Sequence, residues 1–401
     1  MKFIIRSMDK MSSMAVWDLA FRPFFILASL ASVFSLILWL LYLNTGSVLS
    51  DQQLLSPLLW HIHEMFFAFT LTMAIGFILT AVQTWTGLRS LHGSSLVFLT
   101  AIWLSIRFLL LVNSDDVPGL LLVVMVLQAL WWLIVLRTFY RLLTTAGSKR
   151  NYIFLPLLTA LMIMQLSFLY LSQTSVELVI HLAHSAMLIF SIIVGLVAGR
   201  VIPMFTRNAL AIKYQQKIKA TPLLDKALLA FSILGSINFL LSYFVVLPLH
   251  PAWVLFLVGG LHLLRLIHWG SLYTLTNPLL WSLHFSYFCL ASGLILIALS
   301  FFSEQIRIAD AFHLITLGVF GGMILAMITR VSLGHTGRAL QINPWLSLAL
   351  LVIFIAASLR VILAILGQHL WAWNSSALLW IFSYSVFLIF FIPLLIKPRD
   401  S

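Results

Sequence analysis

The sequence predicts an all-α, polytopic membrane protein with about 12 transmembrane helices. Three observations support this fold class. Of the 401 residues, 62% are hydrophobic and only 8% are charged, whereas about a quarter of the residues of a soluble domain are charged. The apolar residues occur in runs of about 20, the length of a helix that crosses a bilayer. The breaks between runs contain Pro, Gly, Asn and charged residues, which leaves no room for a sizeable soluble domain.

The 12 expected helices follow one another through short connections. The first half of the chain contains 21–43, 57–81, 92–112, 117–141, 152–172 and 177–199. The second half contains 222–246, 252–272, 278–301, 309–330, 344–366 and 373–396. We expect residues 1–401 to form a single integral membrane domain. No small-residue cleavage site precedes Arg22-Pro23, so the stretch that carries Lys2, Arg6 and Lys10 is expected to be an uncleaved cytoplasmic lead.

The charged residues of the loops predict the orientation. Loops after even-numbered helices carry the basic residues Arg89, Arg137, Arg141, Lys149, Arg150, Arg200, Arg207, Lys213, Lys217, Lys219, Arg330, Arg338, Lys397 and Arg399. Loops after odd-numbered helices carry Asp51, Asp115, Asp116, Glu177 and Glu304, with Arg307 as their only basic residue. This asymmetry places both termini in the cytoplasm. The net charge of +12 is therefore mainly an orientation signal, and we expect contact with membrane lipid and no nucleic-acid binding.

The second, sixth and tenth helices resemble one another. They open with His61-Ile62-His63-Glu64, His181-Leu182-Ala183-His184 and Phe312-His313, and at nearly equal distances they are followed by Thr86, Thr206 and Thr336 with basic residues beyond. The helices that follow the second and the tenth each carry an arginine in the outer half, Arg107 and Arg360. A period of four helices predicts three four-helix repeats, at about 15–150, 151–275 and 276–400, in a pseudo-threefold arrangement.

The repeat brings five histidines to one depth in the outer third of the membrane: His61, His63, His181, His184 and His313. A single cysteine, Cys289, excludes an internal disulfide and a Cys-rich metal site, so metal chemistry must use histidine. His181 and His184 share a helix face, whereas His61 and His63 point apart, which suggests two neighbouring sites. Imidazole suits copper, iron and zinc. Histidines that only satisfy one another, or lie among headgroups, are the structural alternative.

Arg107 and Arg360 lie inside the outer boundary, against the charge trend of the loops. Their guanidinium groups could extend to outer headgroups. The alternative is that they hold carboxylates, and haem propionates at that depth would suit bidentate pairing.

A second polar stripe runs through the eighth and ninth helices. His262, Arg265 and His268 follow at three-residue steps, and His284 lies on the next helix. A second metal or haem site, a proton path and a hydrogen-bonded helix pair all fit this pattern.

Several motifs in order resemble the NnrS family of bacterial membrane proteins. They are WDLAFRPFF near the start, WHIHEMFFAF and GFILTAVQTWTG in the second helix, GRVIPMFTRNAL after the sixth and MITRVSLGHTGRAL after the tenth. The resemblance covers residues from about 15 to 400. It implies a bacterial inner-membrane protein with 12 helices that contains haem and copper and is linked to nitric oxide, nitrosative stress and denitrification.

The architecture is also similar to that of haem–copper oxidase catalytic subunits, which have 12 helices in three arcs and histidine ligands on helices 2, 6 and 10. The chain departs from them because its seventh helix has no histidine pair and its tenth has one histidine. These departures argue against a binuclear site of that type.

We therefore predict a haem and copper protein that binds, detoxifies or senses nitric oxide. His63 and His313 are predicted as axial haem ligands, because their helices begin and end the repeat series. We predict that copper or a second haem is held by His61, His181 and His184. We predict that the haem propionates are held by Arg107 and Arg360. No catalytic residue is assigned, and turnover would need electrons from a partner protein or quinol. A secondary transporter and a non-catalytic haem-binding sensor or scaffold are the alternatives.

Overall fold

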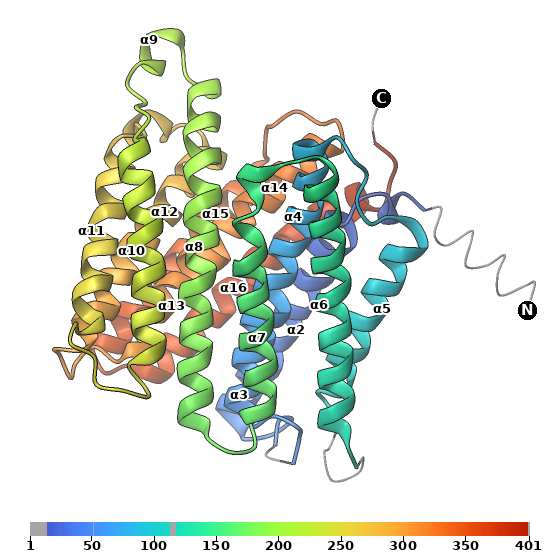
Figure 1. The fold of residues 1–401 in the computed structure, drawn as a ribbon, viewed down its shortest axis with the longest axis vertical. Helices are drawn as coiled ribbons and strands as arrows, with labels where there is room; N and C mark the ends of the chain where they lie inside the picture. The colour runs from blue at the N-terminus through green and yellow to red at the C-terminus, as the bar shows by residue number, and fades with distance from the viewer. Residues whose placement is uncertain (1–13, 51, 113–117, 400–401) are drawn as a thin grey trace, which may run out of the picture. The chain divides into compact units, whose positions relative to one another are not determined.

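The computed structural model describes residues 14–50, 52–112 and 118–399. Lys2, Arg6 and Lys10, and the loop acids Asp51, Asp115 and Asp116, lie outside the described residues. Each of the 12 expected helices corresponds to a helical segment in the described part of the chain (Figure 1). Ten of these segments are long and apolar enough to cross a membrane, and Gly93–Leu109 and Pro251–Ile267 are shorter apolar helices. The all-helical membrane architecture is confirmed at this level, and the three-repeat arrangement stays a prediction.

The chain divides into two compact units. Unit 1 contains 1–183, 328–341 and 387–401. Its helices are α2 (Phe21–Thr45), α3 (Pro57–Ile62), η2 (His63–Thr70), α4 (Leu71–Thr86), α5 (Gly93–Leu109), α6 (Leu120–Thr145) and α7 (Phe154–Leu171). The first turns of α8 (Val176–Ala209) also belong to it. In this unit α2 packs on α4 and η2, and α6 packs on α4, α5 and α7. Fully buried aromatic side chains such as Phe24, Phe66 and Trp132 fill the interior.

Unit 2 contains 184–327 and 342–386. It includes most of α8, then α9 (Ile212–Gln215), α10 (Pro222–Leu241), α11 (Pro251–Ile267), α12 (Pro278–Ser300), α13 (Ile308–Ile315), η6 (Thr316–Gly321), and most of α14 (Gly322–His335), α15 (Pro344–Ile365) and α16 (His369–Leu395). The central helix is α12, which packs on α11, α13, η6 and α15. Close approach is possible because Gly293 and Gly318 leave space for Ile315 and Cys289, respectively.

Several helices run further on the basic side than the hydropathy predicts. The second continues to Thr86, the sixth to Ala209 and the tenth to His335. Hydropathy falls at the first Gln, Arg or Lys, but these residues are good helix formers, so the helix continues beyond the apolar run. The three repeated threonines end up in the same local geometry. Each hydroxyl donates to the carbonyl four residues earlier, Thr86 to Val82, Thr206 to Ile202 and Thr336 to Ser332.

The second and tenth helices share an irregularity. The segments η2 and η6 are π-helical, and they begin at His63 and at Thr316, three residues after His313. A π-helical turn inserts an extra residue into the helix and re-aims the side chains around it, and it occurs often at functional sites. The two histidines predicted as axial ligands therefore both lie at or beside a π-helical turn.

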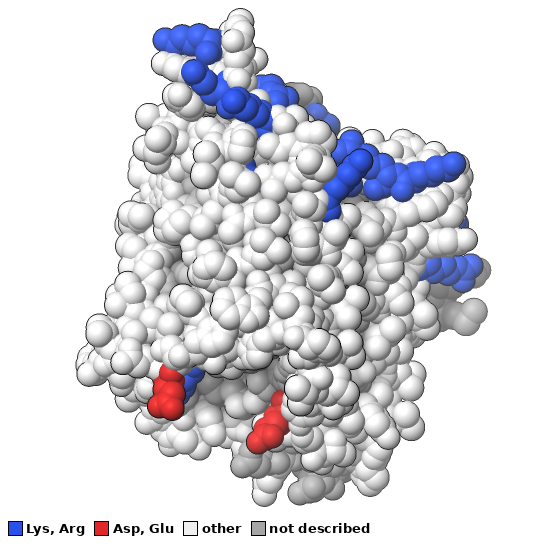
Figure 2. All heavy atoms as spheres, turned by 60° about the vertical axis from the view of Figure 1, so that its left-hand side comes forward, with Lys and Arg blue, Asp and Glu red and all other residues white. Residues whose placement is uncertain are grey.

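Basic side chains of unit 2 gather around the α9 connection (Figure 2). The basic residues of the α9 connection include Lys213, Lys217 and Lys219. This distribution follows the loop asymmetry of the sequence.

Candidate functional site

In unit 1, His63 lies at the centre of a chain of buried polar side chains. His63 has no exposed surface, and Gln165, Glu64 and Trp132 are nearly or fully buried. The indole nitrogen of Trp132 donates to Gln165 Oε1 at 2.8 Å. Gln165 Nε2 lies 3.1 Å from His63 Nε2, and His63 Nδ1 lies 3.1 Å from Glu64 Oε1. Buried polar groups in an apolar protein are costly unless they are paired, and this chain pairs each member.

The partners determine the tautomer of His63. Because Gln165 Oε1 accepts from Trp132, the amide nitrogen of Gln165 faces His63 and can only donate. His63 Nε2 is therefore the acceptor, and the proton is on Nδ1, which donates to Glu64. A histidine that ligates a metal through one nitrogen generally donates its other N–H to a carboxylate or carbonyl. His63 has this arrangement, with its lone pair on Nε2.

Arg107 completes the unit 1 cluster from α5. Its Nη1 lies 3.2 Å from Glu64 Oε1, and its guanidinium lies over the Trp103 ring, 5.4 Å from the centroid. The carboxylate that Arg107 contacts in the structure is thus a side chain of the protein, that of Glu64. The Glu64 carboxylate thus lies between the Arg107 guanidinium and the His63 ring.

Two other predicted histidines, His61 and His181, belong to this unit. His61 stacks on Trp39, with ring centroids 4.4 Å apart and an interplanar angle of 17°. His181, in the first turns of α8, is half-buried. His184 lies one turn further along α8 and belongs to unit 2.

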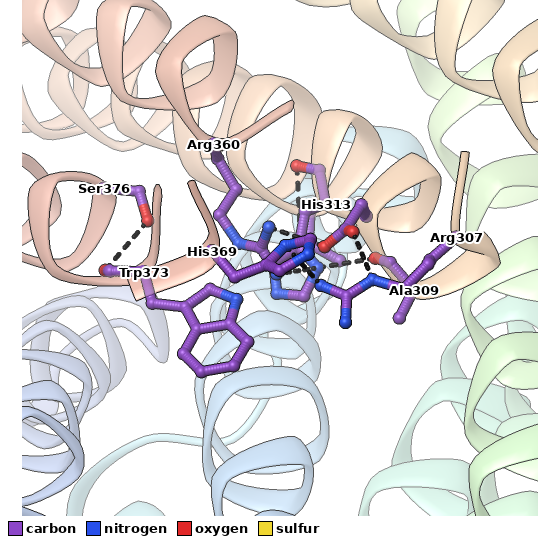
Figure 3. Close-up of polar contacts among 9 residues, drawn as sticks. Arg307, Ala309, His313, Arg360, His369, Trp373 and Ser376 are labelled. Atoms are coloured by element: carbon purple, nitrogen blue, oxygen red, sulfur yellow. Dashed lines mark hydrogen bonds and ion pairs between the residues drawn. The ribbon is translucent and has the colours of Figure 1, made fainter. Parts of the chain in front are cut away.

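In unit 2, two arginines share one carboxylate. Asp310 Oδ1 accepts from Arg360 Nη1 at 2.7 Å, and Asp310 Oδ2 accepts from Arg307 Nε at 2.9 Å. Figure 3 shows Arg307, at the start of α13, and Arg360, on α15, converging with His313 and His369. Asp310 and Arg360 are buried, 3% and 5% exposed. The two arginines that repeat in the sequence thus have matching surroundings in the structure. Arg360 and Arg107 each pair with an acid on the preceding histidine helix.

His313 is oriented by its own helix. Its Nδ1 lies 2.6 Å from the carbonyl oxygen of Ala309, so Nδ1 carries the proton and the lone pair is on Nε2. His184 stacks on Phe312, the neighbour of His313, with ring centroids 4.1 Å apart and planes within 4°. The structure therefore brings His184 against the residue beside His313.

The polar stripe of the eighth and ninth helices forms a buried network in unit 2. Arg265 Nη1 donates to Tyr287 Oη at 3.1 Å and to the Gly195 carbonyl at 3.0 Å, and its Nη2 pairs with Asp225 at 2.7 Å. Tyr287 Oη lies 2.6 Å from His262 Nδ1. Because Tyr287 accepts from a cation, its own proton is donated to His262.

The remaining histidines of the stripe have other partners. His284 lies 2.8 Å from Thr206 Oγ1 through Nε2 and 2.9 Å from Ser271 Oγ through Nδ1. His268 is half-buried, and its Nδ1 contacts the Leu264 carbonyl of its own helix. The hydrogen-bonded helix pair that the sequence suggested is present between α11 and α12, through His262 and Tyr287.

Two tests bear on bound metals. No group of three or more His, Cys, Asp or Glu that could hold a metal ion occurs among residues 14–50, 52–112 and 118–399. Haem iron needs only one or two axial donors, and the donor chemistry of His63 and His313 fits that requirement. A copper ion held by protein side chains alone needs a larger donor group, and the described residues do not fit it.

Sequence reasoning missed several partners, among them Glu64, Gln165, Asp310 and Tyr287. For the two acids a signal was present. A buried arginine in an apolar helix needs a counter-charge, and Glu64 and Asp310 are the acids next to the repeated histidines. For Gln165 and Tyr287 the sequence offers no comparable signal, because neither is charged.

Comparison with protein families gives a match over nearly the whole chain. A family model described as NnrS protein matches residues 15–399. No curated protein matches the chain.

Proposed function

The chain belongs to the NnrS family, and from this premise we propose a haem-binding membrane protein that binds, detoxifies or senses nitric oxide. His63 is the proposed axial ligand of the haem iron, and the same proposal applies to His313. The family association with haem and nitric oxide supplies the cofactor and the ligand. The chemistry of the buried histidine chain in unit 1 supports the role of His63.

One observation carries this assignment. His63 is fully buried, donates through Nδ1 to the carboxylate of Glu64 and keeps the Nε2 lone pair as acceptor. A carboxylate on Nδ1–H fixes the ring orientation and raises the basicity of Nε2, as it does for metal-bound histidines. When bound, ferrous haem supplies an iron centre that coordinates nitric oxide directly.

The residues that contact His63 or its partner Glu64 have different roles. Glu64 orients the imidazole, and Arg107 lies 3.2 Å from the Glu64 carboxylate as its charged partner. Gln165 holds His63 Nε2 through its amide nitrogen, and it would have to release Nε2 if this nitrogen were to hold a haem iron. Gln165 and iron are therefore alternative partners of the same lone pair.

The copper proposal rests on family membership. His61 and His181, suggested for it by the sequence, belong to unit 1, and His184 belongs to unit 2. The described residues form no group of three or more donors that could hold the ion.

We propose the bacterial inner membrane as the location, with both termini in the cytoplasm. The loop charges support this orientation. Electrons for any turnover would come from a partner protein or quinol.

An optical spectrum of the detergent-purified protein, expressed with haem supplied, tests the proposal. A Soret band is expected in the parent and in His92→Ala, whose histidine has no assigned role. His63→Ala should lose or shift the band, because it removes the proposed ligand. Absence of haem in the parent contradicts the proposal, and an unchanged spectrum in His63→Ala reassigns the ligand. Amperometric consumption of nitric oxide with an electron donor then separates an enzyme from a binder or sensor.

A further inference from the structure

In unit 1, three segments that are far apart in the sequence meet around Arg22. Arg22 lies in the first turn of α2, and its Nη1 donates to the carbonyl oxygens of Leu395 at 3.1 Å and Lys397 at 2.6 Å, where α16 ends. The ring of Phe21 lies against that of His335, with centroids 5.5 Å apart. His335 is the last residue of α14. The start of α2 and the ends of α14 and α16 therefore share one corner of the unit.

Positive charges accumulate at this place, which we call the basic corner and which consists of Arg22, His335, Arg338 and Arg399. The charge of Arg338 is close enough to Arg22 to act on it. The charges of Arg399 and Arg22 both act on His335. Like charges held together in this way repel one another, so an anion among them lowers the electrostatic energy of the corner.

Acidic side chains compensate this charge only in part. Among the described residues, the acid whose charge acts on Arg22 is Asp18, four residues earlier in the sequence. The Asp18 side chain is exposed, so water and salt screen its charge. Asp400 follows Arg399 in the sequence and lies outside the described residues. The guanidinium groups of the basic corner thus share one exposed carboxylate in the part of the chain that the structure describes.

One donor of the basic corner is buried without an acceptor. Arg22 is only 2% exposed, and its Nε has no hydrogen-bond partner among the described residues. A buried N–H of a charged group is costly when it is left unpaired. The other members of the corner are more accessible, because His335 and Arg338 are half-buried and Arg399 is exposed. The corner therefore combines an unpaired buried donor with cationic side chains that a ligand can reach.

We propose that the basic corner is a binding site for a phosphate group, held by the guanidinium groups of Arg22, Arg338 and Arg399. Guanidinium groups match the oxygens of a phosphate in paired, charge-assisted hydrogen bonds. The negative charge of the phosphate reduces the repulsion among the three arginines. Its several oxygens also offer an acceptor to Arg22 Nε, which the protein itself leaves without one.

Two sources provide a phosphate at this depth. The candidate membrane span Phe21–Thr45 begins beside Arg22, so the corner lies where apolar chain meets the headgroup region. One source is the headgroup of an anionic lipid such as phosphatidylglycerol, since basic sites beside the cytoplasmic ends of helices bind such headgroups. The other is inorganic phosphate. The lipid source in the cytoplasmic leaflet rests on the proposed orientation, whereas binding measured in detergent depends neither on the orientation nor on haem.

Thermal unfolding of the full-length protein in non-ionic detergent measures the binding. Dihexanoyl phosphatidylglycerol, dihexanoyl phosphatidylcholine and sodium phosphate are titrated separately at constant ionic strength, because a ligand that binds the folded state raises the unfolding midpoint. A saturable rise with phosphatidylglycerol that exceeds the rise with phosphatidylcholine identifies a lipid headgroup as the ligand. A saturable rise with sodium phosphate identifies the free anion.

Substitutions locate the binding in the basic corner. Arg338→Gln and Arg399→Gln should each weaken it about tenfold, since a charge-assisted hydrogen bond is lost. Arg338→Lys keeps the charge but not the two-pronged geometry, so its affinity should fall between those of the parent and Arg338→Gln. Arg399 is exposed, so Arg399→Gln keeps the test decisive if Arg338→Gln does not fold.

Lys217→Gln is the matched control. It removes the same charge from an exposed position in a basic loop of unit 2 and should bind like the parent. Equal losses in Lys217→Gln and Arg399→Gln would show a general response to net charge and overturn the proposal. It is also overturned if neither phosphatidylglycerol nor phosphate gives a saturable rise, or if the arginine variants bind as tightly as the parent.

Discussion

Arg360 holds Asp310 across 2.7 Å in the interior of unit 2, and both side chains are at least nine-tenths buried. The pair links α13, the helix of His313, to α15. Arg107 and Glu64 form the corresponding link between η2 and α5 in unit 1, at 3.2 Å. A carboxylate–arginine contact thus accompanies the histidine helix in both units.

Replacing Asp310 alone should lower the stability of the protein more than replacing Asp310 and Arg360 together. Asp310→Leu leaves two guanidinium groups without their carboxylate, and loss of one partner of a buried pair costs about 3 kcal/mol or more. Asp310→Leu combined with Arg360→Met should recover part of this loss, because no unpaired charge remains at α15. Thermal unfolding of the purified protein measures both. A double variant less stable than the sum of the single changes would contradict the pairing.

Gln165→Leu should load haem faster and more completely than the parent. The substitution removes the amide that holds His63 Nε2 at 3.1 Å, so the lone pair no longer has a competing donor. The growth of the Soret band after haemin addition is the measurement. Trp132→Phe is the comparison, because it removes the hydrogen bond that orients the Gln165 amide but leaves an amide beside His63. Slower loading in Gln165→Leu would show that Gln165 supports the site instead.

Gly199→Ala should destabilise the protein by about 1–3 kcal/mol, the usual cost of overpacking. A Cβ at Gly199 would overlap the guanidinium of Arg265. That group cannot move aside without breaking its contacts with Asp225, Gly195 and Tyr287.

The matched control is Gly260→Ala, on α11. A Cβ at Gly260 meets nothing within 4 Å, so stability should change by no more than about 1 kcal/mol, in the favourable direction of helix propensity. Equal unfolding midpoints for the two alanine variants would argue against a tightly held Arg265.

Cysteine labelling tests the orientation. The native Cys289 is buried, 2% exposed, so it should contribute little background. A membrane-impermeant maleimide added to intact cells should label Glu304→Cys but not Lys217→Cys, because the basic loop is expected in the cytoplasm. Both positions are exposed. Labelling of Lys217→Cys in intact cells would show that the orientation is the opposite of the predicted one.

The position of each helix along the chain followed from the sequence with small errors at the ends. The second helix illustrates the error, since the helix continues to Thr86 after the apolar run has ended. Polar helix formers lower hydropathy without interrupting backbone hydrogen bonds, so hydropathy underestimated the second, sixth and tenth helices at their basic ends. The eighth helix was overestimated, since it ends at Ile267 and was predicted to reach 272.

The candidate site was predictable only in its histidines and arginines. Their types and depths stood out in an apolar chain because buried ionisable groups are costly. Their partners depend on the rotation of one helix against another, which no local pattern specifies. Three pairs depend on helix rotation in this way: Arg107 with Glu64, Arg265 with Asp225, and His63 with Gln165, which lies 102 residues away in the sequence.

By itself, the sequence determined that this is a helical membrane protein of the NnrS family with histidines concentrated at particular helix starts. Burial of apolar runs and loop charge are sums over consecutive residues, so they can be evaluated without a fold. Only the tertiary structure decided which nitrogen of His63 keeps its lone pair, and which carboxylates the arginines hold. Those outcomes depend on hydrogen-bond directions between separate helices, which exist only after the helices have packed.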